Sequence, residues 1–269
     1  MFSSVRQLDR ILRGEATSFD AIRENRFDIP VLGISLVLTI LGMIYGACMG
    51  TFSLTAHGSK EGMQIFATTV KVPALFLLTL LVTFPSLYVF NSLFGSRLRL
   101  MTTLRLMIGS LAVAMAVLSS IGPIVAFFSV SSTSYAFMVI LNVVVFALSG
   151  FLGLGFLLQT LHRLTIAELP APPPLPAPPV VENVEGEDPA PQGSAWGSAI
   201  ALPDHRRVSA GVWLIFRVWV IVFGLVGSQM AWVLRPFIGS PGKDFAWFRP
   251  SGGSFFEAVW GHLLRLFGA

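Results

Sequence analysis

Long stretches without a charged side chain constrain the fold of this chain more than any other feature. No Asp, Glu, Lys or Arg occurs from Leu106 to Leu161, and comparable stretches cover residues 29–56 and 72–95. A fourth stretch, 208–234, is interrupted only by Arg217. A helix needs about 20 apolar residues to cross a bilayer, and its internal hydrogen bonds satisfy the backbone there. The stretches therefore predict an all-α, polytopic helical membrane protein.

Composition supports this class and argues against a nucleic-acid partner. Charged residues make up 12% of the chain, whereas a soluble domain usually carries about 25%. The 18 basic residues outnumber the 14 acidic ones. They gather mostly at the ends of the apolar stretches, where basic side chains fix orientation and contact anionic lipid. The single cysteine, Cys48, excludes an intrachain disulfide, and we interpret it as a small buried apolar residue.

About five transmembrane helices are expected. The stretch from 106 to 161 is too long for one crossing, so we divide it at the polar segment Ser129–Tyr135. The predicted spans cover residues 30–52, 72–94, 105–128, 136–160 and 211–234. The predicted domains are a cytosolic N-terminal amphipathic segment (1–29), a four-helix transmembrane region (30–161), a disordered Pro-rich acidic linker (162–207), a fifth transmembrane helix (208–234), and an aromatic turn with an interfacial amphipathic helix (235–269).

The linker differs in composition from the rest of the chain. Residues 169–204 hold ten of the 17 prolines, together with an acidic patch. Such a sequence cannot bury a core and is expected to be disordered, with local polyproline II structure. We interpret it as a spacer in preference to a docking site for a partner that binds PxxP motifs.

Small residues mark the predicted helix-packing faces. Gly46 and Gly50 form a GxxxG pair in the first span, and Gly153 belongs to a group of small residues in the fourth. Small residues on one helix face let two backbones approach closely in a membrane. These three glycines are therefore candidates for close helix contact.

Two prolines mark the predicted second span. Pro73 falls in its first turn, where the missing N–H costs little. Pro85 falls mid-membrane and is expected to kink the helix. Tyr88 and Asn91 follow Pro85 closely, and broken helices expose backbone groups at which transporters bind substrates. Pro85, Tyr88 and Asn91 are therefore candidate functional positions.

Both ends of the chain predict amphipathic helices. Residues 3–14 place apolar side chains on one side and arginines on the other. That helix either binds the membrane surface or packs on the protein's own surface. Residues 254–268 gather Trp and Phe on one half, which favours a helix that lies on the membrane or caps the bundle. The candidate interfacial anchors are Arg235, Trp247 and Trp260.

The distribution of Lys and Arg predicts the orientation. With five spans, eleven basic residues lie on the side of the N-terminus and six, Lys71 among them, on the other. The excess predicts a cytoplasmic N-terminus and a cytoplasmic Pro-rich linker. The C-terminal tail then lies outside or re-enters the membrane.

The sequence contains no pattern that predicts chemistry. The four histidines, His57, His162, His205 and His262, lie in separate segments without metal-ligand spacing. None of the common hydrolase, phosphate-binding or dinucleotide-binding motifs is present. The predicted spans hold no acidic residue, and Arg217 is their only full charge. We expect no catalytic, cofactor-binding or metal-binding residue and favour a protein that is not an enzyme.

Three segments resemble a family of bacterial multipass membrane proteins: LDRILRGEAT (8–17), KVPALFLLTLLVTFPSLYVFNSLFGS (71–96) and MAWVLRPFIGSPG (230–242). The resemblance implies a location in the bacterial inner membrane and supplies no activity. The five-span architecture is also similar to that of Yip-type proteins, which organise membrane traffic. Likeness of fold does not determine function.

These observations favour one functional hypothesis over two others. The first is a non-enzymatic integral membrane protein that acts as an assembly or scaffold subunit of a membrane complex. Its expected partners are the lipid bilayer and either a protein partner or a second copy of the chain. The alternative is a transporter or channel subunit for a small uncharged or apolar solute. The third, an enzyme that acts on lipid, has only the C-terminal helix in its favour.

Overall fold

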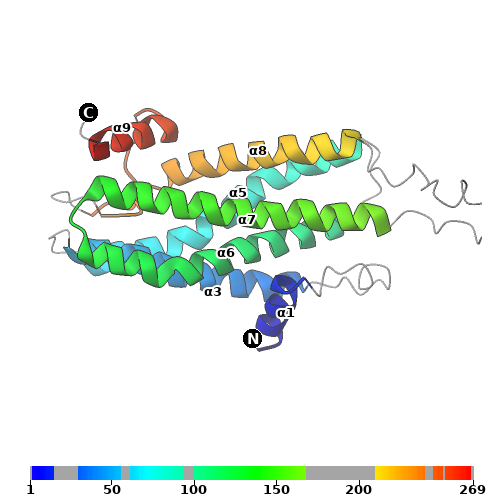
Figure 1. Ribbon diagram of the computed structural model, residues 1–269, viewed down its shortest axis with the longest axis horizontal. Helices are drawn as coiled ribbons and strands as arrows, with labels where there is room; N and C mark the ends of the chain where they lie inside the picture. The colour runs from blue at the N-terminus through cyan, green and yellow to red at the C-terminus, as the bar shows by residue number, and fades with distance from the viewer. Residues whose placement is uncertain are drawn as a thin grey trace, which may run out of the picture.

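The computed structural model describes residues 2–14, 30–55, 61–93, 100–167, 210–239, 245–250 and 252–267. Every regular element in these ranges is a helix (Figure 1). This confirms the prediction of an all-α membrane protein. The predicted linker lies mostly outside the described residues.

Within the residues that the structure describes, four helices are long and apolar enough to cross a membrane. The fifth predicted span is α8, whose described apolar part, Arg217–Val233, is shorter, so that crossing stays a prediction. The long helices are α3 (Val31–Gly50), α5 (Glu61–Leu93), α6 (Leu100–Ser131), α7 (Tyr135–Ala167) and α8 (Ala210–Val233). The short helix α4 (Phe52–Thr55) follows α3.

The break between α6 and α7 falls where the sequence predicts it. Residues 132–134 are not helical, and the chain turns back there. The Ser134 hydroxyl accepts a hydrogen bond from the N–H of Phe137 at 3.3 Å. This is the side-chain cap that starts a helix. At its other end α7 continues to Ala167, into the segment that we assigned to the linker.

The start of the second span was predicted wrongly. Helix α5 begins at Glu61, before the predicted position 72, and continues through both Pro73 and Pro85. Pro73 therefore lies in the helix interior and not in the first turn. Lys71, which we placed outside the membrane, falls inside the apolar helix segment Gly62–Ser86.

The long helices form one bundle in which α3 packs against both α5 and α6 (Figure 1). Helix α6 also packs against α7, and α8 packs against α5. Large side chains such as Tyr45, Met115 and Trp219 fill the interior. Apolar side chains such as Phe151, which is 74% exposed, cover the outside. An outer surface of this kind contacts the lipid bilayer.

Two short helices lie at opposite ends of the bundle (Figure 1). Helix α1 (Phe2–Leu12) packs on α3 and α6, with Leu8 and Ile11 buried. It therefore lies against the protein's own helices, which was one of the two alternatives for this segment. Helix α9 (Phe255–Phe267) packs on α7 and α8.

Candidate functional site

Three polar residues in the first half of α5 form the most unusual buried site in the described part of the chain. Gln64, Thr68 and Lys71 are spaced four and three residues apart, which places them on one face of a helix. All three are buried, with Lys71 only 3% exposed. We call these three residues the Lys71 cluster.

Gln64 and Thr68 bind the same backbone carbonyl of a distant segment. The Gln64 amide donates to the carbonyl oxygen of Phe237 at 2.9 Å, and the Thr68 hydroxyl donates to it at 2.6 Å. Gln64 also lies 3.4 Å from the carbonyl oxygen of Pro236. A buried carbonyl is costly unless it is hydrogen-bonded. The two side chains therefore stabilise the turn that follows α8.

Lys71 extends this contact to the aromatic part of the tail. Its ammonium donates to the carbonyl oxygen of Pro236 at 3.0 Å and to that of Trp247. It lies 5.1 Å from the ring centroid of Phe248. A buried cation needs compensating partners, and here carbonyl oxygens and a ring face supply them. Two stretches of the tail thus meet at one side chain.

Arg235 contacts the residues that follow α8 from the side opposite to α5. Its guanidinium donates to the carbonyl oxygen of Pro250 at 2.7 Å and stacks on the ring of Trp232, 3.6 Å from the centroid. The Trp232 indole N–H donates to the carbonyl oxygen of Gly253 at 3.0 Å. We call the described residues 235–239 and 245–250 the tail segment. It is held by α5 on one side and by the end of α8 on the other.

The other predicted anchors lie in and beside this segment. The ring of Trp247 meets the ring of Phe66 on α5 edge to face, with centroids 6.2 Å apart. Trp260 lies on α9 and is 61% exposed. Arg235 and Trp247 are therefore close to the Lys71 cluster, whereas Trp260 faces outward.

Glycines bring the neighbouring helices close to α5 and α6. A Cβ atom on Gly46 would lie 2.6 Å from the carbonyl oxygen of Thr68, and one on Gly50 would lie 2.9 Å from the Cα of Ile65. A Cβ on Gly153 would lie 2.7 Å from the carbonyl oxygen of Ser110. Side chains do not fit at such distances. Gly46 and Gly50 thus place α3 directly behind the Lys71 cluster.

The remaining candidates lie at the opposite end of α5. Pro85 is exposed on the helix surface. Tyr88 and Asn91 belong to the last turns of α5, but their side chains lie outside the described residues. The structure does not bring these positions to the Lys71 cluster.

A second buried polar contact joins α3 to α7 in the bundle centre. The Tyr45 hydroxyl donates to the side-chain oxygen of Asn142 at 2.8 Å, and the Asn142 amide donates to the carbonyl oxygen of Met138 at 2.8 Å. The Tyr45 ring meets that of Phe146 edge to face at 5.5 Å. Hydrogen bonds between membrane helices contribute about 0.5–1.5 kcal/mol. This contact holds helices together and needs no ligand.

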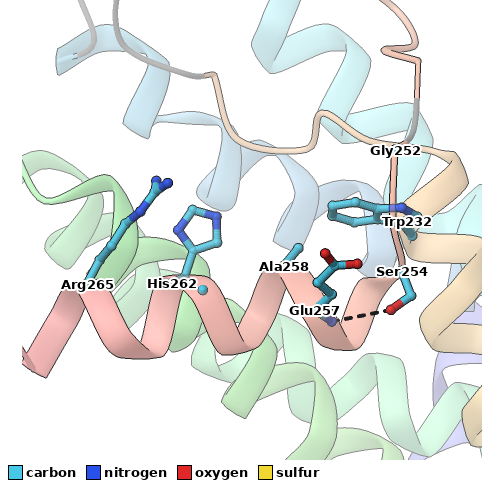
Figure 2. Close-up of a pocket in the computed structure, with 8 residues that line it drawn as sticks. Trp232, Gly252, Ser254, Glu257, Ala258, His262 and Arg265 are labelled. Carbon is cyan, nitrogen blue, oxygen red and sulfur yellow. Dashed lines mark hydrogen bonds between the residues drawn. The ribbon is translucent and has the colours of Figure 1, made fainter. Parts of the chain in front are cut away.

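A cavity of about 310 Å³ lies between α9 and the end of α8 (Figure 2). Figure 2 shows Trp232 and Glu257 close together at one end of it. His262 and Arg265 extend from α9 at the other end. Within the described residues, no group of three His, Cys, Asp or Glu side chains could hold a metal ion.

The comparisons with known proteins add no relative. No family model, no curated protein and no solved structure matches this chain. The resemblances drawn from the three sequence segments stay predictions.

Proposed function

We propose that this membrane protein is a non-enzymatic assembly subunit that presents its C-terminal tail and α9 to a protein partner in the same membrane. The observation that carries the proposal is the attachment of the tail segment. Three buried side chains of α5 hold its carbonyl groups. A buried cation and two buried donors fix the position of this segment relative to α5.

The surface presented in this way is apolar. Phe256, Trp260, Leu264 and Phe267 are all exposed on α9, and their spacing of four, four and three places them on one helix face. We call these four residues the α9 stripe. A rigid surface binds a partner without the entropic cost of ordering itself. Aromatic residues are also the side chains that dominate protein interfaces.

Site-specific photo-cross-linking in native membranes tests the proposal. A cross-linking amino acid replaces Trp260 in one variant and Leu81 in a control. Leu81 is 68% exposed on α5 and faces lipid in the proposed arrangement. The expected result is a discrete protein adduct from position 260, with another subunit or with a second copy, and only lipid adducts from position 81. Lipid adducts alone at both positions would show that the stripe is a membrane anchor and would overturn the proposal.

Transport of a small apolar solute is the second candidate. It places the active region near Pro85 and Asn91, away from the Lys71 cluster. The bundle interior between these regions is filled by large side chains, among them Phe76 and Trp219, which would have to move to open a path. We therefore rank transport second. Its test is solute flux into liposomes with Pro85→Ala and Asn91→Ala variants, and unchanged flux removes its main support.

A further inference from the structure

The residues next to the cavity beside α9 are typical of a membrane surface. The inner wall of the cavity is Trp232, in the last turn of α8, and Arg235 follows that turn directly. Arginine and tryptophan at the end of an apolar helix mark the headgroup region. The cavity has a volume of about 310 Å³ and is open to solvent. Its lining includes Glu257, His262 and Arg265, so it suits a polar group better than an acyl chain.

The two ends of the cavity carry opposite charges. Glu257 and Arg265 both line it, and eight residues of helix separate them by about 12 Å along the axis. Figure 2 shows Glu257 beside Trp232, while Arg265 and His262 lie further along α9 on the same side. A ligand aligned along α9 would therefore meet a carboxylate at one end and a guanidinium at the other.

His262 lines the cavity, but its Nδ1 atom has no accessible surface, so a ligand would reach the other ring nitrogen, Nε2. Its Nδ1 atom is buried and makes no hydrogen bond within the described part of the chain. Buried polar atoms are normally paired. The ring packs against Tyr135 at a centroid distance of 5.4 Å. Burial and, after it, the nearby Arg265 lower the pKa of His262, so the ring is neutral at pH 7 and can donate one N–H.

We propose that this cavity binds a phosphoethanolamine group, with the phosphate on Arg265 and His262 and the ammonium on Glu257. Arginine matches the geometry of phosphate oxygens. A carboxylate accepts the N–H groups of a primary ammonium. A phosphatidylethanolamine headgroup at the membrane surface provides this chemistry, and the free soluble compound provides the same chemistry. Phosphatidylglycerol lacks the amine, and phosphatidylcholine has no N–H to donate.

The test uses the purified full-length protein in mild detergent and measures lipid retention by native mass spectrometry, with thermal unfolding as a second readout. Phosphatidylethanolamine, phosphatidylglycerol, phosphatidylcholine and free phosphoethanolamine are added separately. The expected result is preferential retention of phosphatidylethanolamine. Glu257→Gln should reduce that preference about tenfold, as expected for the loss of a charged hydrogen bond. Arg265→Gln should reduce the retention of all three lipids.

The variants are chosen so that folding is preserved. The Ser254 hydroxyl caps α9 by accepting the backbone N–H of Glu257 at 3.3 Å, and glutamine suits that helix position as well as glutamate does. Arg6→Gln is the matched control, because it removes one exposed arginine from α1 at the other end of the bundle. Its lipid retention should equal that of the wild type.

Each outcome is decisive for the binding chemistry. A thermal shift with free phosphoethanolamine but not with the lipid supports the site and identifies a soluble source. Equal retention of the three lipids by the wild type and by Glu257→Gln, with no shift from the free compound, overturns it. The isolated chain is used without a protein partner, so this result is independent of the proposed assembly role.

Discussion

The two halves of α5 differ in whether their buried polar side chains bond to another segment. In both halves threonine hydroxyls lie close to the carbonyl oxygen four residues earlier, 2.8 Å for Thr68. In the first half, Gln64 and Lys71 donate to carbonyl groups of the tail segment. In the second half, the hydroxyls of Thr79 and Thr83 donate at 2.7 Å to carbonyl groups of α5 itself, four residues earlier. Of these side chains, only those of the first half therefore depend on another segment for their hydrogen-bond partners.

The difference follows from what each half faces. The second half packs on α8, where Gly227 lies near the methyl group of Thr79 and the Trp219 indole N–H is 3.4 Å from the Thr83 carbonyl oxygen. Hydroxyls that bond to their own helix present an apolar surface to such a neighbour. The first half faces an irregular segment, and its side chains supply the donors for the carbonyl groups of that segment. One helix thus combines a membrane-spanning surface with an attachment surface.

Lys71→Met should give the largest effect among single substitutions. Methionine keeps the length of the side chain but leaves the carbonyl groups of Pro236 and Trp247 without their cationic donor. We expect a loss of about 3 kcal/mol, since hydrogen bonds to charged groups contribute about 1.5–3 kcal/mol each. Thermal unfolding in detergent measures it. Lys71→Arg, which keeps the charge and the donors, should lose less. A Lys71→Met protein as stable as the wild type would show that the two halves of α5 do not differ in the proposed way.

Gly46→Ala should give the next largest loss of stability. The added methyl would clash with the backbone at Thr68 and push α3 away from the Lys71 cluster. Overpacking of this kind costs about 1–3 kcal/mol. Gly155→Ala is the matched control in a membrane helix, because nothing lies within 4 Å of its Cβ position. The control should be neutral or slightly stabilising, and equal losses in the two variants would contradict close packing at Gly46.

A pair of double variants compares the two halves directly. Gln64 and Thr68 share the Phe237 carbonyl oxygen, so either donor can satisfy it when the other is removed. Gln64→Leu with Thr68→Val should therefore lose about 2 kcal/mol, more than the sum of the single losses. Thr79→Val with Thr83→Val should change stability by less than about 0.5 kcal/mol. A double loss equal to the sum of the single ones would mean that the two donors act independently.

The smallest expected effect is a pH dependence carried by His262. The folded protein holds its pKa below the ordinary value of 6.5, so the unfolded chain binds more protons as pH falls through that value. Stability should therefore decrease as pH falls below about 6.5 and be unaffected above it. His262→Gln should weaken this dependence in thermal unfolding measured between pH 5 and pH 8. An unchanged pH profile in this variant would assign the dependence to other groups.

The sequence predicts the presence of the long helices better than their ends and their polar contacts. Apolar length and the polar break near Ser132 depend on local composition, and the structure has α6 and α7 where the sequence predicts them. The contact between Tyr45 and Asn142 joins residues 97 positions apart. No local pattern in the sequence specifies this pairing.

Lys71 shows why the site was missed. A charged side chain usually ends an apolar span, so the second span was predicted to start directly after it. The carbonyl groups that compensate its charge lie 165 and 176 residues away in sequence, beyond the reach of any local rule. The spacing of Gln64, Thr68 and Lys71 on one helix face was the signal that could have indicated a longer helix.

The contact between Lys71 and the tail also has a consequence for biosynthesis. Helix α5 leaves the ribosome long before residues 236–247 are made. Lys71 therefore enters the membrane region without its carbonyl partners. Burial of an unpaired ammonium is unfavourable. We therefore expect the first half of α5 to reach its final position only after α8 and the tail segment have been made. A chain that stops before Pro236 keeps this lysine uncompensated. Exposure of this one side chain would therefore distinguish chains that contain the tail segment from chains truncated before it.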